Sequence, residues 1–165
     1  LLEDMHGIKL GVIFSGIDRG NKQYVMEYAR RVKLTDRIVF AGFVSDSDMP
    51  YLYRQSLALV MPTYFGSTNM PPLEAFQLGV PVLYSNIDGA KEQLDNAAFL
   101  LDIDDVYSFV EGVLSLDDEQ AKKDMIKKGH SQLKLVMKKR ELAEKSFCNI
   151  FIQYARRQSC WKNKL

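Results

Sequence analysis

Residues 62–76, with the sequence PTYFGSTNMPPLEAF, place small and turn-forming residues directly before a predicted helix. We expect backbone amides near residues 69–73, together with the helix dipole, to form a binding site for a phosphate group, called here the phosphate cradle. Glu74 follows in what we expect to be the first turn of this helix. Because a carboxylate aimed at a phosphate would repel it, we expect Glu74 to turn aside and accept hydrogen bonds from neutral hydroxyls, such as a ribose diol. The alternative is that Glu74 only favours the helix dipole.

The elements that would position this loop alternate between strands and helices. The predicted strands cover residues 8–14, 37–40, 57–61, 81–84 and 98–101, and the predicted helices begin near residues 22, 49, 71 and 90. Because these strands are short, continuously apolar and separated by helices, we expect a Rossmann-like, doubly wound α/β fold with a parallel sheet covered on both faces. A helical C-terminal tail is expected from about residue 104.

Three predicted loops lie where such a fold places its ligands. Open parallel sheets bind ligands beyond the carboxyl ends of their strands, where helix N-termini point their amides outward. The loops are residues 15–20, 42–45 and 62–72. The candidate binding residues are therefore sought in these three segments.

Charge is divided unevenly along the chain, although the net charge is only +1. Residues 1–120 carry 9 Lys and Arg against 18 Asp and Glu, whereas residues 121–165 carry 13 against 3. The basic segment is either an ordinary solvated helical face or a surface attracted to an anionic lipid, a nucleic acid or a phosphate-bearing substrate. Among these partners we expect an anionic membrane, on which the basic helices would rest. No nucleic-acid partner is expected.

Composition and motif spacing exclude several classes of protein. With 47% apolar and 26% charged residues the chain is neither disordered nor fibrous, and no apolar run reaches the ~20 residues needed to span a bilayer. Cys148 and Cys160 lack the spacing of a zinc site or a disulfide scaffold, which favours a cytoplasmic location. Gly16 and Gly20 do not fit the GxGxxG turn of dinucleotide-binding oxidoreductases, and the sequence has no P-loop.

Several motifs occur in the order and spacing of one known family. They are the G-x-V turn at residues 42–44, the aromatic-rich helix YLYRQS, the turn and helix PPLEAF, the segment GVPV and the downstream Glu92. On these motifs, residues 37–102 resemble the donor-nucleotide-binding half of family-four retaining glycosyltransferases of the bacterial polysaccharide and O-antigen type. A weaker resemblance covers residues 8–129. The resemblance implies that the chain forms one half of a two-domain GT-B fold.

The resemblance also implies roles for individual residues. Phe43 and Val44 would lie against the nucleotide base. Gly16 would permit close approach of the donor, and Glu74 would bind the ribose hydroxyls. The residues assigned to the pyrophosphate and the transferred sugar are Ser67, Thr68, Asn69, Met70 and Pro71. The resemblance implies a UDP- or GDP-sugar as donor substrate, no metal and no other cofactor, and it assigns no catalytic residue.

One departure from the family pattern affects the expected sugar contact. The family often has a Glu eight residues before the equivalent of Glu74, but this position is Gly66. We expect a polar residue, Ser67, Thr68 or Asn69, to replace the missing carboxylate. The departure also leaves a second hypothesis, that the chain is a non-catalytic nucleotide- or sugar-binding module.

The resemblance predicts how the chain would act in a larger enzyme. We expect residues 1–165 to be a single nucleotide-sugar-binding domain, a fragment of a longer two-domain enzyme that is inactive alone. The missing N-terminal domain would bind a saccharide or lipid-linked acceptor. The complete enzyme would transfer a hexose-type sugar with retention, in the cytoplasm or peripherally on the inner face of the membrane.

Overall fold

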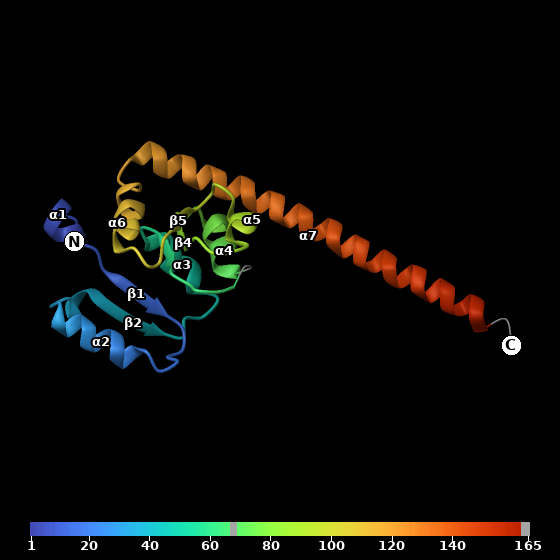
Figure 1. Ribbon diagram of the computed structural model, residues 1–165, viewed down its shortest axis with the longest axis horizontal. Helices are drawn as coiled ribbons and strands as arrows, with labels where there is room; N and C mark the ends of the chain where they lie inside the picture. Colours follow the sequence, from blue (N-terminus) through green and yellow to red (C-terminus); the bar gives the residue numbers. More distant parts are fainter. Residues whose placement is uncertain (67–68, 163–165) are drawn as a thin grey trace. The chain divides into compact units, whose positions relative to one another are not determined.

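The computed structural model describes residues 1–66 and 69–162, with side chains described up to residue 158 (Figure 1). Contacts within the chain define two compact units, Leu1–Ser56 and Leu57–Leu165, called here the N-terminal unit and the C-terminal unit. Both units contain parallel strands joined by helices.

The N-terminal unit contains one β-α-β repeat. Its elements are α1 (Leu2–His6), β1 (Val12–Ser15), α2 (Lys22–Arg31), the 3-10 turn η1 (Thr35–Arg37), β2 (Ile38–Gly42) and α3 (Met49–Gln55). The strands β1 and β2 pair in parallel, with Phe14 opposite Phe40, and α2 makes the crossover. The two rings stack with their centroids 4.9 Å apart. This register places the residues that follow β1 beside those that follow β2.

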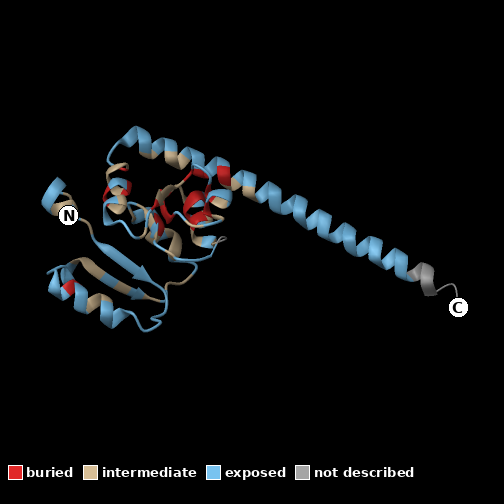
Figure 2. Ribbon diagram, viewed as in Figure 1, coloured by how far each residue is buried: buried red, intermediate tan, exposed pale blue. Residues whose placement is uncertain are grey.

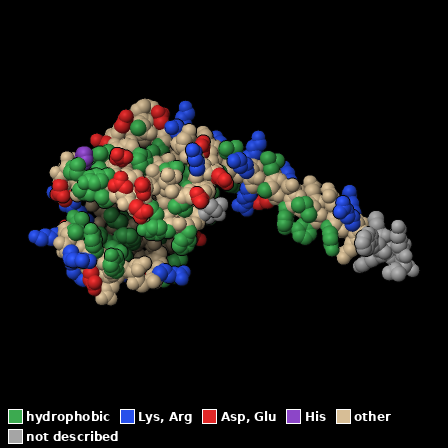
Figure 3. Space-filling view, in the orientation of Figure 1, with side chains coloured by type: hydrophobic (Ala, Val, Ile, Leu, Met, Phe, Trp, Pro, Cys, Tyr) green, Lys and Arg blue, Asp and Glu red, His purple; other side chains and the backbone are tan. Residues whose placement is uncertain are grey.

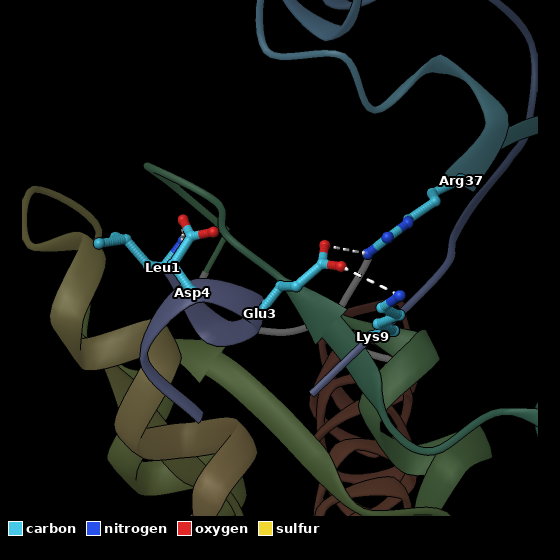
Figure 4. Close-up of polar contacts among 5 residues, drawn as sticks. All are labelled: Leu1, Glu3, Asp4, Lys9 and Arg37. Carbon is cyan, nitrogen blue, oxygen red and sulfur yellow. Dashed lines mark hydrogen bonds and ion pairs between the residues drawn. The ribbon is translucent and has the colours of Figure 1, made fainter. Parts of the chain in front are cut away.

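An ion-pair cluster ties α1 to the segments that precede the two strands (Figure 4). Glu3 on α1 lies 2.8 Å from Arg37 Nη1 and 3.3 Å from Lys9 Nζ. The hydrogen bond from Arg37 is the main cause that lowers the pKa of the Glu3 carboxyl below its ordinary value. The same bond raises the pKa of Arg37. The ion pairs therefore hold α1 in place, and they depend on pH because Glu3 must be ionised to form them.

The C-terminal unit contains a three-stranded parallel sheet in the order β3-β4-β5. Its elements are β3 (Leu59–Met61), α4 (Met70–Leu78), β4 (Val82–Ser85), α5 (Ala90–Leu94), β5 (Phe99–Leu101), α6 (Val106–Leu114) and α7 (Glu119–Lys162). The central strand β4 is buried at all four residues, and further buried residues lie on α4 (Figure 2). Gly79 ends α4 in the left-handed conformation, with φ of 70°.

The apolar core of this unit lies between the sheet and the helices that follow it. Leu83 on β4, Leu101 on β5 and Leu116 are at most 3% exposed. The partly buried side chains packed against them are Ala58, Phe99, Phe109, Val113 and Met125. Burying such side chains stabilises the fold by about 1.5–3 kcal/mol each. The core thus fixes β4, whose carboxyl end faces the loop before α4.

The long helix α7 has two differently packed parts. Its first part contacts α4 and α5, and Gly129 and Gln132 are buried there. From residue 138 to residue 158 every side chain is exposed (Figure 2). In the part of the chain that the structure describes, no helix is long and apolar enough to cross a membrane.

The fold class expected from the sequence is confirmed, and two details differ. The hydrogen bonds of the described residues divide the strands between a two-stranded and a three-stranded sheet. The residues of β1 are all exposed, rather than covered on both faces as expected. A two-stranded sheet with one crossover helix has too few neighbours to cover both faces of β1.

The expected helical tail is also interrupted. The helix α6 ends at Leu114, and α7 starts at Glu119. Asp118 accepts hydrogen bonds from the amides of Gln120 at 2.8 Å and Ala121 at 3.3 Å, so its side chain starts a new helix. Apolar spacing predicted a helical tail without marking where one helix ends and the next begins, because it does not register this cap.

Candidate functional site

The loop between β3 and α4 (residues 62–69) enters α4 through Asn69, the N-cap residue. Asn69 has an extended backbone, with φ of −115° and ψ of 141°. Among the first three helical residues, 70–72, Met70 alone has an amide hydrogen, since Pro71 and Pro72 have none. Within the phosphate cradle expected at residues 69–73, Pro71 and Pro72 therefore cannot donate to a ligand.

The backbone of Asn69 is held on both sides by one side chain, Gln93 of α5. The Asn69 amide donates to Gln93 Oε1 at 3.1 Å, and Gln93 Nε2 donates to the Asn69 carbonyl at 2.8 Å. Gln132 of α7 in turn donates through Nε2 to the backbone carbonyl of Gln93 at 2.8 Å. Three elements thus meet at the N-terminus of α4. The amide of Asn69, which we expected to contact a phosphate, already has a partner within the protein.

The side chain of Asn69 takes part in a second cluster, with Gly66 and Tyr84. Asn69 Nδ2 donates to the Gly66 carbonyl at 2.8 Å and also contacts the Tyr84 hydroxyl. The Tyr84 hydroxyl donates to the same Gly66 carbonyl at 2.9 Å. Tyr84 lies on β4 and is fully buried. The buried Tyr84 side chain thus contacts both Gly66 and Asn69.

This cluster gives a physical reason for the glycine at the position where the family often has Glu. Gly66 has φ of +102°, and a β-carbon there would lie 3.0 Å from Asn69 Nδ2. Residues other than glycine rarely adopt this backbone conformation. A side chain at residue 66 would therefore strain the backbone and require the Asn69 amide to shift by a few tenths of an ångström.

A buried serine at the end of β4 fixes the start of the same loop. Ser85 Oγ accepts a hydrogen bond from the Thr63 amide at 2.6 Å and donates to the Met61 carbonyl at 3.3 Å. Ser85 is fully buried. Sequence reasoning missed Tyr84, Ser85, Gln93 and Gln132. The signal for the first two was a polar residue type at the end of an apolar strand.

Glu74 is the fifth residue of α4 and lies in its second turn, not in the first turn as expected. The helix starts at Met70, one residue earlier than the prolines suggested, and this shifts Glu74 along the helix. Its side chain is exposed. Glu74 therefore lies on the surface of the protein and not in its core.

The predicted residues of the N-terminal unit gather at the carboxyl ends of β1 and β2. The Gly16 amide donates to the Gly42 carbonyl at 2.7 Å, and Gly16 has φ of +111° with open space where a β-carbon would lie. Phe43 is 78% exposed, and Val44 is half-buried. The structure therefore brings Gly16 close to the turn that contains Phe43 and Val44. Ser67 and Thr68, the remaining predicted site residues, lie outside the described residues.

Asp18 and Lys22, in and just after the first loop, have structural contacts. Asp18 accepts hydrogen bonds from the amides of Gly20 at 2.8 Å and Lys22 at 3.2 Å, and these bonds lower the pKa of its carboxyl. Lys22 Nζ lies 5.2 Å from the centre of the Phe40 ring. Lys22 therefore makes a cation–π contact with the sheet.

Aspartates of two Asp-x-Asp triplets hold local turns. The sequence contains the Asp-x-Asp triplets 46–48 and 102–104. Ser45 Oγ donates to Asp48 Oδ2 at 2.7 Å, and the Asp104 amide donates to Asp102 Oδ1 at 3.0 Å. Among the described residues, no three His, Cys, Asp or Glu side chains gather at a spacing that would hold a metal ion.

Parallel strands, crossover helices and loops at the strand ends place the chain in the Rossmann-like class that forms each half of a GT-B glycosyltransferase. Residues 2–132 match the family described as glycosyl transferases group 1, and the chain belongs to this family. The resemblance inferred from residues 37–102 is thereby confirmed.

Curated relatives of this family include enzymes of O-antigen synthesis. The chain is 28% identical over 135 residues to O-antigen chain mannosyltransferase B of Escherichia coli, covering 81% of this chain and 32% of the relative. It is 30% identical over 101 residues to O-antigen chain mannosyltransferase RfbU of Salmonella typhimurium, covering 59% of this chain and 29% of the relative. The chain therefore spans about a third of the length of these two relatives.

Solved glycosyltransferase structures share the fold at low sequence identity. Sucrose-phosphate synthase from Thermosynechococcus elongatus matches with a TM-score of 0.69 and 17% identity, over 83% of this chain and 38% of that one. Anabaena HepE, solved in complex with UDP and glucose, matches with a TM-score of 0.64 and 20% identity, over 84% and 40%. At these identities the similarity establishes the fold.

Proposed function

We propose that this chain is the donor-nucleotide-binding domain of a longer, retaining glycosyltransferase that transfers a hexose-type sugar from a UDP- or GDP-sugar. Family membership supports sugar transfer, and the two named mannosyltransferases support a role in bacterial polysaccharide synthesis. The acceptor would be a saccharide or a lipid-linked sugar bound by an N-terminal domain. The observation that carries the proposal is the exposed Glu74, one turn behind a helix N-terminus that is held by side chains from β4 and α5.

Each predicted residue has a distinct role in this proposal. Glu74 accepts hydrogen bonds from the ribose hydroxyls, and Phe43 and Val44 contact the base. Gly16 leaves room for the donor, since open space lies where its β-carbon would be. The Met70 amide and the positive end of the α4 dipole stabilise negative charge on the diphosphate.

The chemistry proposed for these residues is stabilisation of the leaving group. In a transfer with retention the nucleoside diphosphate departs with its negative charge, and oriented amides lower the barrier because their dipoles are already aligned. Ser67, Thr68 and Asn69 stay the proposed contacts to the sugar and the pyrophosphate, of which Ser67 and Thr68 lie outside the described residues; Pro71 has no amide hydrogen to donate. No side chain of this chain is assigned as a catalytic nucleophile or base.

The donor proposal is tested by titrating the full-length protein with UDP, GDP, UDP-glucose and GDP-mannose in a calorimeter. Glu74→Ala should weaken donor affinity by about ten- to a hundredfold, because a charged hydrogen-bond acceptor is lost. Glu111→Ala, which removes an exposed glutamate from α6, is the matched control. Unchanged affinity in Glu74→Ala would remove the ribose assignment.

A second candidate function is a non-catalytic nucleotide- or sugar-binding module. The observation that favours it is Gly66, which stands where the family often has a carboxylate and whose φ of +102° and close contact with Asn69 disfavour a side chain. Transfer of radiolabelled sugar to a lipid-linked acceptor distinguishes the two. The anomeric configuration of the product, read by NMR, tests retention, and activity in excess EDTA tests the proposal that no metal is needed.

We further propose that the exposed part of α7 contacts an anionic membrane surface. Phe147, Ile150, Phe151 and Tyr154 recur at the three- and four-residue spacing of one helix face, and each is about 60% exposed. Residues 134–158 carry seven Lys and Arg against two Glu, and basic and apolar side chains are both visible on this part of the helix (Figure 3). An apolar stripe beside basic residues suits an interfacial helix.

A further inference from the structure

We propose that Gln93 is a positioning residue for sugar transfer: its side chain fixes the N-terminus of α4, and Gln132 of α7 fixes Gln93. The proposal rests on the proposed function of α4 as part of the donor site. It concerns residues that do not themselves touch the donor. What they determine is where the Met70 amide and the Glu74 carboxylate lie.

The chemistry of the Gln93 side chain matches what one backbone residue requires. A primary amide has a donor and an acceptor on adjacent atoms, so it can satisfy the N–H and the C=O of one residue at once. Gln93 does this for Asn69, with bonds of 3.1 Å and 2.8 Å. Because both backbone groups of Asn69 are held, the direction in which the chain enters α4 is fixed.

The N-terminus of α4 depends on this external support because its local supports are missing. The Asn69 side chain does not cap the helix. Its Nδ2 instead donates to Gly66 and Tyr84, whereas an Asn at the N-cap ordinarily accepts from an amide in the first turn. Two of the first three helical residues are prolines and offer no amide to a capping side chain. Gln93 therefore performs the task that a capping side chain performs in other helices.

Gln132 connects Gln93 to α7 by a further hydrogen bond. Its side chain is 7% exposed, and its Nε2 donates to the Gln93 carbonyl at 2.8 Å, across 39 residues of sequence. In the same part of α7, Gly129 lies against Phe76 of α4. Helix α7 is thus hydrogen-bonded to α5 and packs on α4, close to Gln93, which positions the N-terminus of α4. Buried polar networks of this kind rigidify a site when every member is satisfied.

The first test measures the positioning itself, in the full-length protein without ligand. Gln93→Met keeps the length of the side chain and removes both hydrogen bonds. We expect faster hydrogen exchange at the amide of Asn69 in this variant, because this amide loses its acceptor. Gln77→Met, which makes the same change at an exposed site on α4, should leave the Asn69 amide as in the wild type. Unchanged exchange in Gln93→Met would overturn the proposal.

The second test measures the consequence for the donor, by titration with UDP and GDP well below the unfolding temperature of each variant. We expect Gln93→Met to weaken the affinity by about tenfold, equivalent to about 1.4 kcal/mol, and Gln132→Met to weaken it less. Leu116→Val, a core substitution away from α4, controls for general destabilisation: it should lower the melting temperature and leave the affinity unchanged.

The outcomes separate the two proposals. Wild-type affinity in Gln93→Met, together with nucleotide binding by the wild type, overturns the role of Gln93 and leaves the donor proposal intact. Equal losses of affinity in Gln93→Met and Leu116→Val assign Gln93 to general stability and also overturn its role. A wild-type protein that binds neither UDP nor GDP overturns the proposed function and, with it, the donor role of Gln93.

Discussion

Gly129 of α7 lies so close to Phe76 of α4 that a β-carbon at residue 129 would be 2.7 Å from Phe76 Cδ1. Phe76 is only 2% exposed, so its ring has little room to move. The absence of a side chain at residue 129 is thus what lets α7 approach α4. The same approach brings Gln132, one turn later, to Gln93.

Gly129→Ala should destabilise the protein, although alanine is the better helix former. The gain in helix propensity is about 1 kcal/mol, whereas overpacking a tight core contact costs about 1–3 kcal/mol. We expect a net loss in the free energy of unfolding of about 1 kcal/mol, measured by urea denaturation. The double variant Gly129→Ala/Phe76→Leu should recover part of the loss. An increase in stability in the single variant would show that the ring moves aside.

Gly66→Ala should lower the free energy of unfolding by about 1–3 kcal/mol, because it adds backbone strain and a close contact with Asn69. Gly20→Ala is the matched control, since Gly20 has the same φ of +102° and no atom within 4 Å of its β-carbon position. The difference between the two variants in urea denaturation reports the contact with Asn69. Equal losses would mean that strain alone accounts for the glycine at residue 66.

The Glu3 cluster predicts a stability contribution that depends on pH. The pKa of Glu3 is lowered below 4.5 in the folded chain, chiefly by Arg37, so the contribution is present above that value and is lost as the pH falls through the folded pKa. Glu3→Gln should therefore be less stable than the wild type at neutral pH, with the difference vanishing in acid. Glu27→Gln, at an exposed glutamate that accepts from the neutral Gln23, is the control. A carboxyl NMR titration that gives Glu3 an ordinary pKa would contradict the prediction.

The membrane proposal predicts binding that depends on lipid charge. Co-sedimentation of the full-length protein with vesicles that contain phosphatidylglycerol should exceed that with phosphatidylcholine alone, and should weaken in high salt. Lys138→Glu/Lys139→Glu should reduce binding by tenfold or more, at about 1 kcal/mol for each lysine removed. Lys127→Glu/Lys128→Glu makes the same charge change in the part of α7 that packs on α4, and should have a smaller effect. Binding that ignores lipid charge would leave these residues as a solvated helical face.

The sequence by itself predicted the elements whose signals are local. The end of α4 at Gly79 follows from a residue that adopts the left-handed conformation without strain. The strand around Leu83 and the helix at residues 90–94 follow from short apolar runs and the turns that bound them. These features depend on residues within a few positions of one another. The family was identifiable for the same reason, because its motifs are short and contiguous.

The support of the candidate site was decided only by the tertiary structure. Tyr84 meets Gly66 across 18 residues, Gln93 meets Asn69 across 24, and Gln132 meets Gln93 across 39. No periodicity relates such positions, because their contacts arise from the parallel register of β3 with β4 and the packing of α7 against α4 and α5. The sequence could place Glu74 near a helix start. Which amides remain for a ligand, and why residue 66 must be glycine, depends on side chains that only folding brings together.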